Sequence, residues 1–236
     1  FERNKERTLM KLNYLDVGAA DFKLPQNWKI YQPELEVFLF EPDKRSSLME
    51  LPDVQVYENA LGSVKETRKL NLTRKPACSS FFEPNREFLD QFPDASRWDI
   101  LDEIQVNTIP LDDMAIKAHF IKLDVQGAEL EILHGARQTL FSTLGLVVEV
   151  SFHEIYSNQP LFHDIQSFLR QYGIDFYDFT TEYRYNRVEL NRTGQLAFAD
   201  ALFLRNPNEI KNMGQESKKH YNMICQVFGK FDLILD

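Results

Sequence analysis

The sequence has few cysteines and no long apolar run, and each absence excludes a class of protein. Only two of its 236 residues are cysteines, Cys78 and Cys225, and they match no metal-binding or redox spacing. We therefore expect reduced thiols in a cytoplasmic protein rather than a disulfide framework. No apolar stretch approaches the ~18 residues of a membrane-spanning helix, and no signal peptide is visible. The sequence accordingly predicts no stable membrane insertion.

Basic residues are also outnumbered, which argues against a nucleic-acid partner. Lys and Arg total 27 while Asp and Glu total 36, so the formal net charge is −9. A phosphate backbone would be repelled by this charge on average. The hydrophobic fraction of 43% and the charged fraction of 27% are ordinary for a globular domain, and a chain this long can bury a sizeable core.

Short apolar runs that alternate with helical stretches predict an α/β fold. Five of these runs are apolar on both faces, as in a parallel sheet that helices cover on each side. The five runs are residues 14–17, 37–40, 54–57, 120–125 and 146–150. The expected helices span residues 43–51 (with Asp43 as the cap), 128–141 and 161–172. Two late runs, 176–179 and 197–204, predict an antiparallel pair at one end of a mostly parallel sheet.

Two segments do not fit this alternation. Residues 73–118 are rich in Phe, Pro and charge, and we expect them to form a lid or substrate wall at the carboxyl edge of the sheet. The alternative is a small satellite core under a loop. Residues 207–236 follow the main domain (1–206) as a polar extension with an apolar end, which would dock on the domain or on a neighbouring copy in a homo-oligomer.

Acidic residues lie at the ends of four predicted strands: Asp16, Glu41, Asp124 and Glu149. Ligands of open α/β sheets bind at the carboxyl ends of the strands. The loop after Asp16 has one glycine and lacks a phosphate-binding fingerprint. A cationic ligand with a diol, such as S-adenosylmethionine, fits this pattern, and the missing phosphate site argues against NAD. An acid after the second strand can accept hydrogen bonds from both ribose hydroxyls, a role that would suit either cofactor.

Five sequence segments then carry a family resemblance. They are residues 14–20 (YLDVGAA), 40–43 (FEPD), 59–62 (NALG), 121–136 (IKLDVQGAELEILHGA) and 147–156 (VVEVSFHEIY). In this order, over roughly residues 9–205, they resemble the FkbM-type methyltransferases, which use S-adenosylmethionine and are generally O-methyltransferases. The resemblance implies a Rossmann-like class I methyltransferase fold, with seven strands, an antiparallel last strand and helices on both faces.

The resemblance also implies roles for single residues. The methionine end of the cofactor pocket would be shaped by Asp16, Gly18, Ala19 and Ala20, and the ribose would be held by Glu41. The adenine would be bordered by Pro42, Asp43, Asn59 and Ala60. Asp124 would lie near the amino group and the methyl group of the cofactor. The chain departs from the family pattern in two places. Asp21 or Phe22 replaces a further glycine, and Gln126 replaces a usual glutamate.

A hydroxyl acceptor must lose a proton during methyl transfer, so a general base is expected. The candidates are His153 (with Glu154 as its partner), Glu149 and Asp124, although His153 could equally be a surface residue and Asp124 a helix cap. The candidate acceptor-binding residues are Ser79, Ser80, Phe81, Gln126 and Tyr183. Asp112 and Asp113 are better explained as helix caps than as metal ligands. The four histidines other than His153 show no metal-ligand spacing with one another, so no metal is predicted.

These observations favour an S-adenosylmethionine-dependent methyltransferase that modifies a hydroxyl of a small molecule, sugar or lipid-linked metabolite. Three alternatives stay open. The chain could be a nucleotide- or NAD-dependent enzyme on the same sheet, or a non-catalytic methyltransferase-like binding module, which Asp21 and Gln126 would allow. The methyl group could also be accepted by nitrogen or by a protein side chain.

Overall fold

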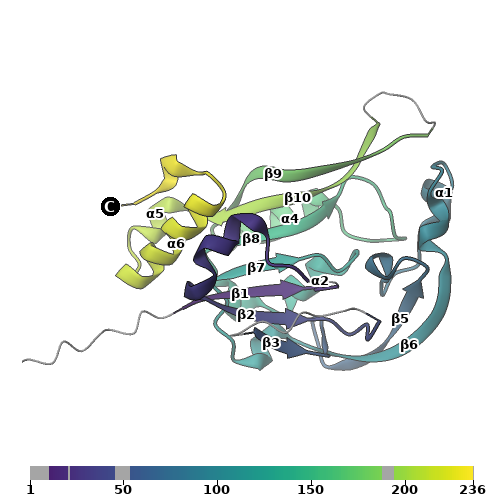
Figure 1. Ribbon diagram of the computed structural model, residues 1–236, viewed down its shortest axis with the longest axis horizontal. Coiled ribbons are helices and arrows are strands. Elements are labelled where there is room, and N and C mark those ends of the chain that lie inside the picture. The colour runs from purple at the N-terminus through teal and green to yellow at the C-terminus, as the bar shows by residue number, and fades with distance from the viewer. Residues whose placement is uncertain (1–10, 21, 46–53, 188–193, 236) are drawn as a thin grey trace, which may run out of the picture.

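A computed structural model describes residues 11–20, 22–45, 54–187 and 194–235, and its centre is a seven-stranded sheet (Figure 1). The strand order is β3-β2-β1-β7-β8-β10-β9. The strands are β1 (Leu12–Val17), β2 (Leu35–Phe40), β3 (Val54–Tyr57), β7 (Phe120–Leu123), β8 (Gly145–Ser151), β9 (Ile174–Tyr185) and β10 (Gln195–Arg205). The pairs from β3 to β8 are parallel, and β10 runs antiparallel to β8 and β9. This confirms the predicted sheet, with the last strand inserted in the opposite direction.

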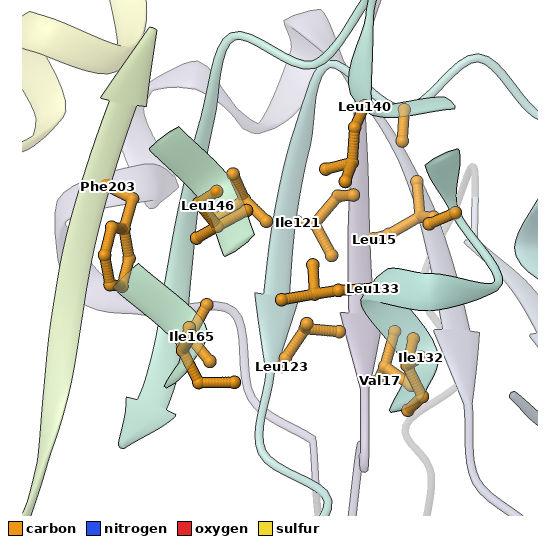
Figure 2. Packing of buried hydrophobic residues seen from close by; sticks show 14 of the residues in the cluster. Leu15, Val17, Ile121, Leu123, Ile132, Leu133, Leu140, Leu146, Ile165 and Phe203 are labelled. Carbon is orange, nitrogen blue, oxygen red and sulfur yellow. The ribbon is translucent and has the colours of Figure 1, made fainter. Parts of the chain in front are cut away.

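One face of the sheet packs on three helices. They are α2 (Glu129–His134), α3 (Arg137–Leu140) and α4 (Phe162–Arg170). Alternate strand residues such as Leu15, Ile121 and Leu146 point to this face and meet Leu133 and Ile165 of the helices (Figure 2). Because side chains alternate along a strand, the same strands leave their other residues for the opposite face.

The single helix predicted over residues 128–141 is wrong, since α2 and α3 are separated at Gly135 and Ala136. At Gly135 the chain passes so close to Gly62 that a Cβ atom would overlap the Gly62 carbonyl oxygen. The contact between these two backbones therefore decides where α2 ends. The helix predicted over residues 161–172 is confirmed by α4.

The opposite face packs on η1 (Gln26–Glu34) and on the C-terminal helices α5 (Pro207–Ile210) and α6 (Gln215–Val227). In Figure 1 the yellow α6 lies beside the dark purple η1. Trp28 of η1 packs between Tyr14 and Phe120 of the strands, at ring-centroid distances of 5.3 and 5.0 Å. Phe228 follows α6 and contacts the same tryptophan. The C-terminal extension thus docks on its own domain, and its contact with a second copy stays a prediction.

A smaller three-stranded sheet, in the order β4-β6-β5, lies beyond the main sheet. Its strands are β4 (Ala60–Leu61), β5 (Glu66–Thr73) and β6 (Ile100–Ile109). The same part of the chain contains the short helices η2 (Pro76–Cys78), α1 (Arg86–Leu89), η3 (Ala95–Trp98) and η4 (Leu111–Met114). A further short helix, η5 (Phe231–Leu233), follows α6 near the C-terminus. The sequence interpretation missed β5 and β6, although Ile104, Val106 and Thr108 alternate with polar residues and turn inward.

Two further expectations depend on which residues are described. The helix expected from Asp43 through Leu51 falls mostly on residues 46–53, outside the described part of the chain. Among the residues that the structure describes, no helix combines the length and the apolar character needed to cross a bilayer.

Candidate functional site

A cavity of about 770 Å³ opens at the carboxyl ends of the parallel strands. This volume is within the usual range for small-molecule sites. Gly18, Glu41 and Asp124 follow β1, β2 and β7, and Glu149 lies near the end of β8. The facing wall comes from residues 75–79, 92–98 and 183–186. Segment 73–118 therefore supplies part of the wall, while its movement as a lid stays a prediction. Leu89 and Trp98 of the same segment also belong to a small satellite core.

The structure brings most of the predicted site residues to this cavity. Those in its lining are Gly18, Ala20, Glu41, Pro42, Asp43, Ala60, Ser79, Phe81, Asp124, Gln126, Glu149 and Tyr183. Five predicted residues are outside the lining. Asp16 is buried behind Lys122, Ala19 belongs to the core, and Asn59 is exposed beside a neighbouring groove. Ser80 is buried and donates to the Gln126 carbonyl, and His153 lies elsewhere.

Gly18 ties the first loop to the Asp124 segment. Its φ of +81° is in the left-handed region, and a Cβ atom there would overlap the Asp124 carbonyl oxygen. Its N–H donates to the Phe40 carbonyl at 3.0 Å. One residue without a side chain therefore lets the loops after β1, β2 and β7 meet at one edge of the cavity.

Glu41 and Asp43 lie close together but have different partners. Burial raises the pKa of Glu41 to about 7, although its Oε1 accepts a 2.7 Å hydrogen bond from the Asp43 N–H. Burial also acts to raise the pKa of Asp43, but hydrogen bonds from the Arg45 side chain and backbone lower it overall. Arg45 thus forms its ion pair with Asp43, and Glu41 has no ion-pair partner within the described part of the chain.

Lys122 is the cation at the centre of the acidic site. Its Nζ lies 3.5 Å from Asp16 Oδ1 and 3.4 Å from Asp124 Oδ2. Burial acts to lower its pKa, but these two carboxylates hold the pKa well above its ordinary value. Burial raises the pKa of Asp16 to about 6, despite the lysine. The sequence interpretation did not select Lys122, although a lysine inside an apolar strand is a recognisable signal.

Gln126 joins the two carboxylates that end β7 and β8. Its Nε2 donates to Asp124 Oδ1 at 2.8 Å and to Glu149 Oε1 at 2.9 Å. Its Oε1 lies 2.9 Å from the Tyr156 hydroxyl, which also lies 2.8 Å from the Cys78 carbonyl. Gln126 has a φ of +58°, which is uncommon for a residue with a side chain and is found at functional sites. The amide supplies a donor where a glutamate would add a third negative charge.

Glu149 is the acid most altered by its surroundings. Its side chain is enclosed by β8, β10 and the Asp124 loop, and burial followed by the charge of Asp124 raises its pKa well above the ordinary range. Asp200 lies opposite it on β10, and burial raises that pKa as well. Both carboxyl groups therefore hold a proton more tightly than exposed ones do.

His153 is outside this arrangement. Its ring stacks on Phe88 at a centroid distance of 5.2 Å, and its Nε2 lies 2.7 Å from Gln195 Nε2. Glu154 is not its partner, since Glu154 Oε2 accepts from the Asn158 N–H. The structure therefore places Glu149 and Asp124, but not His153, in the cavity wall.

The possible metal ligands have other roles. Asp112 caps α3 by accepting from the N–H groups of Gln138 and Thr139, as expected, and Asp113 pairs with Lys65. Elsewhere the fold gathers His119, His220 and Glu216, whose ligand atoms lie within 4.8 Å of one another, a grouping that their sequence spacing does not reveal.

The tautomer of His119 argues against a metal at this cluster. Its Nδ1 accepts a 2.9 Å hydrogen bond from the Asn13 N–H, so the proton of the neutral ring is at Nε2. Burial and the neighbouring His220 lower the pKa of His119 to about 3, which keeps the ring neutral. Neither ring nitrogen therefore offers a free lone pair. A metal-binding histidine instead donates its second N–H to an acceptor.

Comparisons with known proteins bear on the family of this chain. A model of the methyltransferase FkbM domain matches residues 16–176. The 2-O-methyltransferase NoeI of Sinorhizobium fredii (strain NBRC 101917 / NGR234) is 27% identical over 171 residues, which span 61% of this chain and only 65% of NoeI. A crystal structure of methyltransferase FkbM from Methylobacillus flagellatus KT matches 82% of this chain and 43% of that one, with 13% identity and a TM-score of 0.47.

A second solved structure is magnesium protoporphyrin IX methyltransferase (ChlM) from Synechocystis PCC 6803 with bound SAM. It matches 84% of this chain and 72% of ChlM, with 11% identity and a TM-score of 0.39. The family model covers more than half of the chain, and the resemblance seen in its motifs is thereby confirmed. This protein belongs to the FkbM methyltransferase family.

Proposed function

We propose that the protein is an S-adenosylmethionine-dependent methyltransferase that acts on a hydroxyl group. The carrying observation is the acid-lined cavity, in which Glu41 has no ion-pair partner among the described residues and the Asp16–Asp124–Glu149 group has more carboxylates than Lys122 balances. The name of the relative NoeI, a 2-O-methyltransferase, supports a hydroxyl as the acceptor.

The residues fit this cofactor by their chemistry. Glu41 would accept hydrogen bonds from the ribose diol, and the acids around Lys122 would attract the positive charges of the methionine end. Gly18 lets the first loop approach the Asp124 backbone more closely than any residue with a side chain could. S-adenosylmethionine, when bound, supplies a methyl group activated by its sulfonium.

We assign the proton-accepting role to Glu149. It lines the cavity, its raised pKa makes the ionised carboxylate a stronger proton acceptor than an exposed one, and Gln126 fixes the orientation of its carboxylate. Asp124, held by the same amide and by Lys122, would act mainly on the cofactor. The surrounding apolar wall, including Phe40 and Phe198, would exclude water from the reacting groups.

A thermal-shift titration tests the cofactor. S-adenosylmethionine and S-adenosylhomocysteine are compared with NAD and ATP, using the wild type, Glu41→Gln and the control Glu58→Gln, whose exposed side chain pairs with Lys44. At ligand near 100 times its Kd, binding adds ~2.7 kcal/mol of stability. This corresponds to a rise in Tm of roughly 5–10 °C.

The expected result is a rise with the two adenosyl-sulfur ligands alone, lost in Glu41→Gln and kept in Glu58→Gln. An equal rise with NAD, or none with S-adenosylhomocysteine, would refute the proposed cofactor. A non-catalytic module would bind the cofactor yet release no S-adenosylhomocysteine with any hydroxylated acceptor in a turnover assay.

A further inference from the structure

The wall that faces the acids contains a cation without a counterion. Arg97 lines the cavity, and no described carboxylate lies within ion-pair distance of its guanidinium. The neighbouring arginines of this segment differ, since Arg74 pairs with Asp99 and Arg86 pairs with Asp90 and Asp99. A half-buried charge without a partner is costly, so its place in a cavity wall calls for an explanation.

Aromatic rings fix the position of this guanidinium. The Arg97 Cζ lies 3.9 Å from the centre of the Trp98 ring and 5.1 Å from that of Tyr185. These rings hold the planar group in place, so that little side-chain entropy would be lost when it binds a ligand. Arginine held in this way suits a planar or tetrahedral oxyanion, which it can contact through two N–H groups.

Two buried polar atoms in the same wall also lack a partner with hydrogen-bond geometry among the described residues: Arg97 Nε and Tyr185 Oη. The Arg97 charge lowers the pKa of Tyr185 against the larger, raising effect of burial, but the geometry of a hydrogen bond is not met. Each unpaired buried donor costs about 1–3 kcal/mol. Lys75, on the same side of the cavity, has no ion-pair partner in the described ranges.

We propose that this wall is an oxyanion-binding site for the methyl acceptor, with Arg97 as its main contact. The acceptor would then be a hydroxylated molecule that carries a carboxylate or phosphate group. The inference rests on the proposed function, because it concerns the molecule that receives the methyl group. The acids at the strand ends suit the cationic cofactor. On the facing wall Lys75 and Arg97 outnumber the acid Asp94, so this side suits an anionic acceptor.

Isothermal titration calorimetry tests this site, with saturating S-adenosylhomocysteine present throughout. The probes are compared within two scaffolds, and within each scaffold they differ in charge. Glucuronate (carboxylate) and glucose 6-phosphate (phosphate) are compared with glucose, and 4-hydroxybenzoate is compared with phenol. The variants are Arg97→Gln and Arg97→Lys, with Arg170→Gln as control, since Arg170 is an exposed residue at the end of α4 outside the cavity lining.

We expect at least one charged probe to bind tighter than its neutral counterpart. Arg97→Gln should weaken that binding roughly 10- to 100-fold, Arg97→Lys less, and Arg170→Gln not at all. The proposal is overturned if no charged probe is preferred, or if the preference survives in Arg97→Gln. If the wild type does not bind S-adenosylhomocysteine, this result counts against the proposed function instead. Binding of S-adenosylhomocysteine by Arg97→Gln shows that this variant is folded.

Discussion

The side-chain amide of Gln126 donates a 2.9 Å hydrogen bond to Glu149 Oε1, and this contact links the ends of two neighbouring parallel strands. The same Nε2 also donates to Asp124. Two carboxylates that would otherwise repel one another therefore share a neutral donor. The family position usually holds a glutamate, so this chain has one negative charge fewer at the centre of its site.

Gln126→Glu should destabilise the protein in a pH-dependent manner. The variant removes the shared N–H donor and places a third carboxyl group beside Asp124 and Glu149. We expect a loss of about 1–3 kcal/mol in the free energy of unfolding at pH 8. At pH 5 the loss should be smaller, because protonated carboxyls can donate. Urea denaturation at both pH values measures it, with the exposed Gln105→Glu on β6 as control. An equal loss at both values would contradict the explanation.

Glu41→Gln should stabilise the ligand-free protein above neutral pH. The pKa of Glu41 is about 7 in the folded protein and lower, near 4.5, when exposed. The folded state therefore binds the proton more tightly, and the free energy of unfolding falls as the pH rises from about 4.5 to 7. The amide variant lacks this penalty, which is on the order of 3 kcal/mol.

Thermal unfolding across pH 4.5–8 measures this effect. Wild type and Glu41→Gln should have similar Tm values at the acidic end, and the variant should be several degrees more stable at pH 8. Glu58→Gln is the control, because Glu58 is exposed. A difference in Tm that does not change with pH would show that burial of the Glu41 charge is not its cause.

Gly18→Ala should be markedly more harmful than a matched glycine substitution. Both Gly18 and Gly229 have positive φ values, +81° and +66°. A Cβ atom at Gly18 would overlap the Asp124 carbonyl, whereas at Gly229 it would meet nothing within 4 Å. We expect a cost of about 1 kcal/mol at Gly229 from the backbone alone, and about 2–4 kcal/mol at Gly18. Similar losses in chemical denaturation would show that the Asp124 loop moves aside without cost.

Zinc should not stabilise the protein through His119, His220 and Glu216. The Asn13 N–H occupies His119 Nδ1, and the proton at Nε2 blocks the other nitrogen. Tm should therefore be the same with equimolar zinc and with a chelator. A rise in Tm with zinc that disappears in Glu216→Gln would overturn this interpretation of the His119 tautomer.

The parallel strands could be predicted because each has its own apolar pattern. The runs ending at Val17 and Phe40 are apolar on both faces, which requires helices on both sides, and their terminal acids mark the carboxyl edge. The strand β6 was missed because charged residues interrupt its alternation, and its pairing with β5 depends on residues far apart in the chain. Likewise, the close contact between Gly135, at the end of α2, and Gly62 joins residues far apart in the chain.

The sequence by itself determined the α/β class, the family and the acids at the strand ends, because these depend on local periodicity and on motifs that are continuous in the chain. Only the tertiary structure decided which side chains meet. It joined Gln126 to Glu149, placed Lys122 between two acids and turned His153 away. It also set the Arg97 guanidinium over the Trp98 ring, with no carboxylate of the described residues at ion-pair distance. These relationships are set by packing between distant segments, which determines the burial, charge and hydrogen bonding of each group.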